Sequence, residues 1–137
     1  MIKNIRHTGI VTDNLKNSLN FYQKILGFKI KKKMIETGTT IDNVSNLKNV
    51  KVETVKLKLG NNTDMIELLY YHSHKRKFSD KNYKIPRVGI SHFAVTLKNI
   101  DKFYYSLKNK IKFISKPRYS IDGNVKMTFC RAPEGLR

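Results

Sequence analysis

The chain has 137 residues, about the size of one domain, and a formal net charge of +18 at pH 7. It contains neither a cleavable apolar leader nor an apolar run of the roughly 20 residues that cross a bilayer, so we expect a soluble, cytoplasmic protein without a membrane partner. The single cysteine, Cys130, cannot form an internal disulfide, which fits a reducing compartment. The positive excess is mostly Lys spread along the chain, without a basic tail, so nucleic acid is not the expected partner.

The sequence repeats itself at an offset of 85 residues, which pairs His7 with His92. Ile5 to Ile10 matches Ile90 to Val95, and both histidines stand in third place. The match continues without a gap over about two dozen positions. Further matched pairs are Asn14 with Asn99, Leu15 with Ile100, Leu26 with Ile111, and Phe28 with Phe113. This agreement indicates an internal duplication of one module.

The first copy begins with a short predicted strand, Ile5 to Val11, in which apolar residues alternate with others. A helix follows, for which Asp13 or Asn14 is a suitable N-cap, and its apolar spacing of the helical kind ends at Gly27. Three further strands alternate at period two. They are predicted at Phe28 to Glu36, Val50 to Leu59 and Met65 to Tyr71.

The second copy offers the same elements in the same order. A strand from Ile90 to Leu97 precedes a helix from Ile100 to Ile111, with Asn99 before it. Two more strands, Lys112 to Lys116 and Val125 to Arg131, are predicted before the sequence ends. The unit is therefore βαβββ, and its second copy is one strand short.

We expect a single domain over residues 1–137. Its first module covers about residues 1–72, and its second covers about residues 88–137. The polar and basic stretch of about residues 73–87 is the predicted linker between the modules.

Three residues have types that suit a divalent cation: His7, Glu67 and His92. Imidazole nitrogen and carboxylate oxygen are ligands for Zn, Ni, Co, Mn and Fe(II), between which residue type does not distinguish. Each residue also has a structural alternative, because a lone His on a strand is usually exposed or hydrogen-bonded and a lone Glu can face solvent. The equivalent register of the two histidines and the acidic residue within an apolar run favour the metal-ligand interpretation.

Several segments together resemble successive blocks of the vicinal-oxygen-chelate superfamily, which includes glyoxalases, extradiol dioxygenases and bleomycin resistance proteins. The resemblance covers nearly the whole chain, although its helix motif ending in Leu26-Gly27-Phe28 says nothing about substrate. The segments are His7-Thr-Gly-Ile-Val, Leu19-Asn-Phe-Tyr-Gln-Lys-Ile-Leu-Gly-Phe28, Ile66-Glu-Leu-Leu69, His92-Phe-Ala-Val95 and Ala132-Pro-Glu-Gly135.

The resemblance implies an α+β fold in which two βαβββ modules form a curved mixed sheet around a metal ion, the second module lacking its last strand. The family's ligand positions fall on His7, Glu67 and His92. The fourth ligand is normally a Glu shortly after the Pro-x-Gly turn, which here would lie past Arg137, so we expect a C-terminal tail beyond the given sequence. With three ligands, Glu67 is also the candidate catalytic carboxylate, as either ligand or base.

By the same resemblance we expect a metal-dependent, glyoxalase-like lyase or isomerase that forms a homodimer and acts on a small, anionic substrate. Basic residues that could attract such a substrate are Lys116, Arg118, Lys126 and Arg131. An epimerase of the family would carry an acidic base before the third strand, and Ser45 to Val50 has none. Two alternatives remain open: a non-catalytic protein that binds or sequesters a small ligand, as resistance proteins do, and an extradiol-type dioxygenase.

Overall fold

The computed structural model describes residues 1–61, 64–79 and 88–137. The chain divides into two compact units, Met1–Ser79 and Asp80–Arg137, and each is described by itself. Most of the predicted linker, residues 80–87, lies outside the described residues. None of the helices in the described parts has the length and apolar content that a membrane crossing requires.

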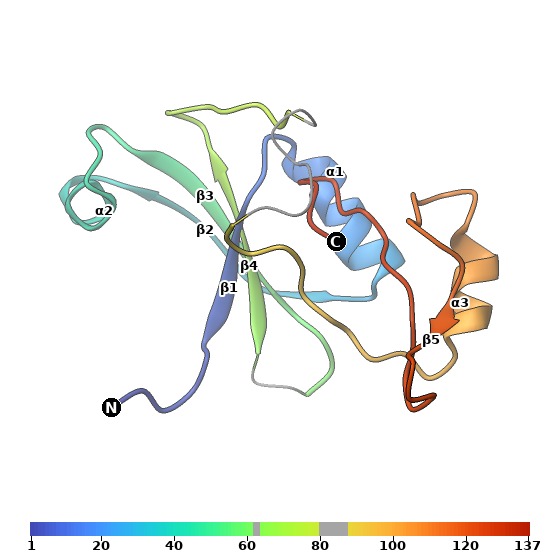
Figure 1. Ribbon diagram of the computed structural model, residues 1–137. Coiled ribbons are helices and arrows are strands. Elements are labelled where there is room, and N and C mark those ends of the chain that lie inside the picture. Colours follow the sequence, from blue (N-terminus) through green and yellow to red (C-terminus); the bar gives the residue numbers. More distant parts are fainter. Residues whose placement is uncertain (62–63, 80–87) are drawn as a thin grey trace. The chain divides into compact units, whose positions relative to one another are not determined.

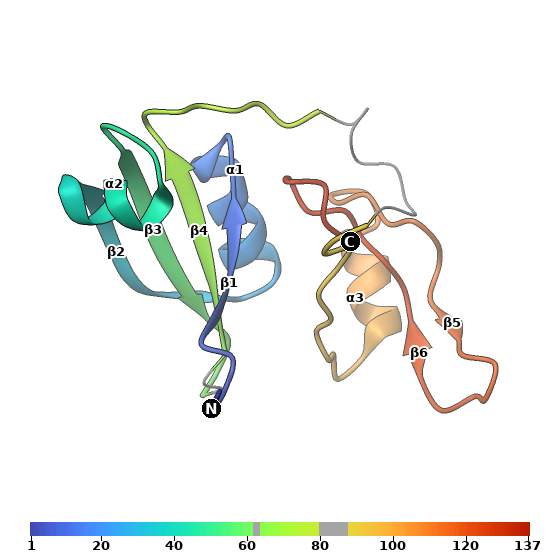
Figure 2. The ribbon, with the colours of Figure 1, turned by 60° about the vertical axis from the view of Figure 1, so that its left-hand side comes forward.

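The first unit is built on a curved, four-stranded mixed sheet with the strand order β1-β4-β3-β2 (Figures 1 and 2). Its strands are β1 (His7–Val11), β2 (Lys29–Thr37), β3 (Lys51–Lys58) and β4 (Met65–Tyr71). β1 runs parallel to β4, whereas β4 pairs with β3 and β3 with β2 in antiparallel fashion. All four strands were predicted from the alternation of apolar residues, with boundaries correct to within two residues.

The predicted first helix forms in two continuous parts, α1 (Leu15–Leu19) and η1 (Asn20–Ile25). Asn14 is its N-cap, since the Asn14 carboxamide oxygen accepts a hydrogen bond from the backbone N–H of Asn17 at 3.0 Å. In the second part the turn widens, and the N–H of Leu26 bonds to the carbonyl of Phe21, five residues earlier. Gly27 then ends the helix at a φ of +79°, a conformation that favours glycine.

The core of the first unit lies between this helix and one face of the sheet. Tyr22 is fully buried and meets Phe21 and Phe28 edge-on, with ring centroids 5.2 and 6.2 Å away. The sheet contributes branched apolar side chains that are almost completely shielded from solvent. These are Ile10, Val55, Leu57, Ile66 and Leu68.

One helix of the first unit was not predicted. α2 (Thr39–Ser45) lies between β2 and β3, where a loop was expected. The Asp42 carboxylate accepts hydrogen bonds from the N–H groups of Asn49 and Val50 at 2.9 and 2.8 Å, so it ties this helix to the segment that enters β3.

The second unit contains α3 (Ile100–Leu107), β5 (Arg118–Tyr119) and β6 (Lys126–Met127). α3 confirms the second predicted helix, although it ends four residues before Ile111. Its N-cap Asn99 accepts a hydrogen bond from the N–H of Lys102 at 2.9 Å. Because Asn99 matches Asn14 at the offset of the repeat, the two caps support the duplication at the level of structure.

The strands of the second unit differ from the prediction. The strand predicted at Lys112 to Lys116 keeps only an isolated bridge at Phe113, and β5 lies just after it, where no strand was predicted. Ile90 to Leu97 has no strand pairing among the described residues, and Val125 to Arg131 keeps only β6 and an isolated bridge from Cys130 to Phe113. In the first unit β1 is held by its parallel pairing with β4. Among the described residues of the second unit, 88–137, no strand pairs with the segment from Ile90 to Leu97, and a strand forms only where a neighbour shares its hydrogen bonds.

The α+β class, with a curved mixed sheet and a short second module, is confirmed.

Candidate functional site

The face of the sheet opposite α1 carries a row of polar side chains. β3 and β4 pair Lys56 directly with Glu67, and β1 and β4 pair Gly9 with Glu67. Since side chains two residues apart share a face of a strand, His7 lies on the same face as these residues. The sequence thus places an imidazole, a carboxylate and an ammonium on three adjacent strands.

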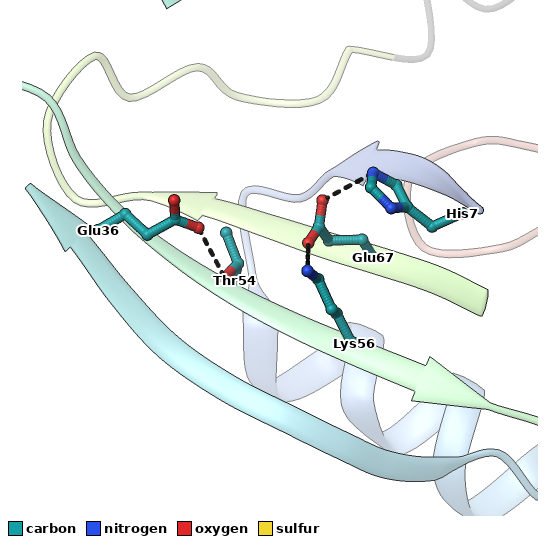
Figure 3. A network of polar contacts seen from close by, with 5 residues as sticks. All are labelled: His7, Glu36, Thr54, Lys56 and Glu67. Carbon is teal, nitrogen blue, oxygen red and sulfur yellow. Dashed lines mark hydrogen bonds and ion pairs between the residues drawn. The ribbon is translucent and has the colours of Figure 1, made fainter. Parts of the chain in front are cut away.

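Glu67 is the centre of this group (Figure 3). Its Oε2 lies 3.2 Å from His7 Nε2, and its Oε1 lies 3.3 Å from Lys56 Nζ. The Glu67 side chain is 12% exposed, whereas those of His7 and Lys56 are 33% and 24% exposed. The carboxylate is therefore largely shielded, but both of its partners can be reached from solvent. We call His7, Glu67 and Lys56 the carboxylate triad.

Gly9, on the same face as the triad, is packed closely against the neighbouring strand β4. Gly9 stands opposite Glu67 in the parallel ladder. A Cβ at this position would lie 3.2 Å from Leu69 Cδ1, closer than ordinary van der Waals contact. Glycine is thus the residue that fits between these two strands without displacing a neighbour.

Sequence reasoning identified His7 and Glu67 but missed three polar residues of the same face. They are Lys56, Thr54 and Glu36, of which the last two form a hydrogen bond from the Thr54 hydroxyl to Glu36 Oε1 at 3.1 Å (Figure 3). The register between β3 and β4 would have identified Lys56, because it is the direct neighbour of Glu67. That register depends on the length of the loop between the strands, which periodicity alone does not fix.

The donor pair of His7 and Glu67 fits a divalent cation by its spacing. Bonds from nitrogen or carboxylate oxygen to such metals are about 2.0–2.2 Å long. Two donor atoms 3.2 Å apart can therefore bind one cation together. The second ring nitrogen, His7 Nδ1, is buried and has no hydrogen-bond partner among the described residues. The Lys56 ammonium opposes a second cation at this place, but it contacts the other carboxylate oxygen.

His92, the third predicted ligand, belongs to the second unit. Its Nδ1 lies 2.7 Å from the hydroxyl oxygen of Ser91, and its ring meets that of Phe129 edge-on at 5.4 Å. The His92 side chain is exposed. Within the described parts of the chain, no group of three or more His, Cys, Asp and Glu side chains is close enough to hold a metal ion. Within the first unit, His7 and Glu67 are brought together, and the role of His92 is part of the proposal below.

A second His–Glu–Lys group lies on the opposite face of the same sheet. Glu53 accepts a hydrogen bond from Lys33 Nζ at 2.7 Å, and His72 Nε2 lies 3.1 Å from its other oxygen. The Lys33 ammonium, followed by the contact with His72, lowers the pKa of the Glu53 carboxyl below its ordinary value of 4.5. We call these residues the Glu53 cluster. They have the same types and nearly the same spacing as the triad, so they provide an internal control for experiments on it.

The basic residues considered for attracting a substrate have different surroundings. Lys126 Nζ binds Asp101 Oδ2 at 2.5 Å, and this contact raises the pKa of the lysine. Lys116 and Arg118 are exposed on the second unit. Within the first unit, the cation that contacts the candidate site is Lys56, which composition alone did not single out.

Comparisons with known proteins agree with the geometry of the fold. A family model for the Glyoxalase/Bleomycin resistance protein/Dioxygenase superfamily matches residues 4–137. No curated protein matches the chain significantly.

Crystal structures with the same fold include a glyoxalase family protein from Bacillus cereus, at a TM-score of 0.84 and 18% identity over 99% of this chain and 91% of that one. The trypanothione-dependent glyoxalase I of Leishmania major aligns at a TM-score of 0.66 and 22% identity, over 98% of this chain and 83% of that one. A glyoxalase family protein from Enterococcus faecalis aligns at a TM-score of 0.68 and 24% identity, over 98% of this chain and 93% of that one. At these identities the likeness concerns the fold alone.

Proposed function

Because the chain belongs to the glyoxalase/bleomycin resistance protein/dioxygenase superfamily, we propose that it is a metal-dependent, glyoxalase-like lyase or isomerase. The observation that carries the proposal is the pair of His7 Nε2 and Glu67 Oε2, 3.2 Å apart on one face of the sheet. His92, which matches His7 at the repeat offset, is proposed as the third ligand. A divalent cation held there would polarise a substrate oxygen and stabilise negative charge that develops on it.

Glu67 is proposed as the catalytic carboxylate. One of its oxygens faces His7, and Lys56 anchors the other. A carboxylate held in this way has a fixed orientation, and it can accept a proton from a substrate carbon when one of its contacts is released. Its shielding from solvent limits competition from water at the moment of transfer.

Lys56 supports the assignment of a small, anionic substrate. Its ammonium is partly exposed and lies on the same face as His7 and Glu67. It can attract a negatively charged group to the site while it keeps Glu67 in place, which makes it a positioning residue. We further propose that the protein acts as a cytoplasmic homodimer, in keeping with the family and with the single cysteine.

The metal content of purified protein tests this proposal. After incubation with Zn, Ni, Co or Mn salts and removal of the excess, elemental mass spectrometry should find about one metal ion per chain. His7→Ala, Glu67→Gln and His92→Ala should each lose most of it. The matched controls His72→Ala and Glu53→Gln change the same residue types in the Glu53 cluster and should retain the metal.

Two results would contradict the proposal. Wild-type protein that binds no metal under any of these conditions would favour a non-catalytic ligand-binding protein instead. Metal loss in the Glu53 cluster variants, with retention in the His7 and Glu67 variants, would place the ion elsewhere. Circular dichroism of every variant separates loss of ligands from loss of fold.

A further inference from the structure

The first unit contains a pocket of about 670 Å³ that lies apart from the carboxylate triad, where β1 leads into α1. Its lining combines two kinds of residue. Val11, Leu47 and Tyr71 are apolar or aromatic and are called the apolar wall, and the consecutive Lys75, Arg76 and Lys77 are cationic and are called the basic wall. We call it the basic pocket. It combines an apolar surface with concentrated positive charge in a volume that is typical of small-molecule sites.

The basic wall is held in place at both ends. At its start, the Ser73 hydroxyl accepts a hydrogen bond from the N–H of Lys51 at 2.9 Å. At its end, the N–H of Phe78 donates to Asp13 Oδ2, also at 2.9 Å. Between these anchors, His74 adopts a φ of +39°, which a residue other than glycine seldom does. The segment is thus fixed across the end of the sheet.

The side chains of the basic wall form no ion pair among the described residues. Among the ion pairs of residues 1–61, 64–79 and 88–137, none involves Lys75, Arg76 or Lys77. Asp13 also lines the pocket; its carboxylate accepts a hydrogen bond from the N–H of Phe78 and keeps its negative charge. Three cations against one carboxylate leave the lining with a net positive charge, which raises the local concentration of anions.

We propose that the basic pocket binds a small organic phosphate whose ring or apolar body lies against Tyr71, Val11 and Leu47. The phosphate oxygens would be bound by Lys75, Arg76 and Lys77, because a guanidinium can donate two parallel hydrogen bonds to a phosphate. Aromatic and aliphatic side chains in the lining of the same pocket select an apolar group over a bare ion. This site is independent of the metal and of the proposed reaction.

The proposal is tested by calorimetric titration of the full chain with phenyl phosphate, in the presence of a chelator and at about 0.15 M salt. Wild-type protein should bind one equivalent saturably. The triple variant K75S/R76S/K77S should bind at least about ten-fold more weakly, because it loses the charge-assisted hydrogen bonds. The control K29S/K31S/K32S removes the same charge from exposed positions of β2 and should stay within about two-fold of wild type.

A second comparison tests the apolar wall. Tyr71→Ala should weaken phenyl phosphate more than inorganic phosphate, whereas Tyr119→Ala, an exposed tyrosine of the second unit, should affect neither. Three results would overturn the proposal. They are a lack of saturable binding by wild type, equal losses of phenyl phosphate affinity in the two triple variants, and displacement of phenyl phosphate by duplex DNA to the same extent from the two triple variants. The last result would identify unspecific attraction by net charge.

Discussion

At the scale of single residues, the carboxylate triad shows how register creates a site. Glu67 is surrounded by apolar residues in sequence, yet each of its two oxygens meets a basic group from a neighbouring strand. A carboxylate that is shielded from water needs such partners, because an unpaired buried charge is costly. The same group is therefore suited both to stability and to binding a cation.

Lys56 should oppose a metal ion on Glu67, since both carry positive charge. Lys56→Met is expected to bind Zn or Co about two- to five-fold more tightly than wild type, a size typical of partly exposed charge pairs. Calorimetric titration measures the difference. The control Lys58→Met removes a charge two residues further along β3, and it should have a smaller effect. Weaker metal binding by Lys56→Met would mean that the lysine supports the site instead of opposing the ion.

Glu53 should make the stability of the first unit depend on pH. The pKa of its carboxyl is lower in the folded protein than the ordinary value of 4.5. Its stabilising effect is therefore fully present above pH 4.5 and is lost as the pH falls through the lowered pKa of the folded protein. Glu53→Gln should therefore lower the free energy of unfolding by about 1–3 kcal/mol at pH 7 and by much less at pH 3. Urea unfolding at several pH values measures this, with the exposed Asp64→Asn as control. A difference from wild type that does not change with pH would rule out the ion pair as its cause.

Residue identity allowed His7 and Glu67 to be predicted, because both types are rare on otherwise apolar strands. Lys56 and the Glu53 cluster could not be predicted, since lysine is so common in this chain that no single one stands out. Their roles follow from cross-strand pairing, which brings together residues that are distant in sequence. Whether His92 joins His7 and Glu67 remains a prediction of the repeat.

At the scale of elements, the most reliable signals were the periodic spacing of apolar residues and the residues that cap helices. The four strands of the first unit and the helices after Asn14 and Asn99 were predicted from them. α2 was missed because it is short and depends on Asp42, whose carboxylate binds the backbone seven and eight residues later. The strand from Ile90 to Leu97 was wrongly predicted, since alternation identifies a segment able to form a strand but not the partner it requires.

The cap of the first helix should contribute measurably to stability. Asn14→Ala removes the acceptor for the N–H of Asn17 and should lower the free energy of unfolding by about 1 kcal/mol. Chemical denaturation followed by circular dichroism is a suitable measurement. Asn61→Ala, at an exposed turn, should change stability by less than about 0.5 kcal/mol. Equal effects of the two substitutions would contradict the capping role.

At the scale of the whole molecule, the two units differ in how they bury apolar side chains. The first has a core of aromatic and branched residues, whereas many large apolar side chains of the second are exposed, among them Ile121, Tyr119 and Val125. The free energy of local opening rises with the amount of buried apolar surface. The amide protons of the two units should therefore exchange with solvent at different rates.

Hydrogen exchange should therefore find the amides of β3 and β4 protected at least about a hundred-fold more than those of α3. Mass spectrometry of peptic fragments resolves these segments. Similar protection in α3 and in the central strands would show that the second unit is stabilised as strongly as the first.

The central claim is that His7, Glu67 and His92 bind one metal ion, and the most direct measurement is a double-mutant cycle on metal affinity. His7→Ala and His92→Ala should each weaken Zn or Co binding strongly, and the double variant should lose much less than the two single losses predict together, because both ligands serve the same ion. An unchanged affinity in His92→Ala, or losses that simply add, would mean that His92 does not share an ion with His7.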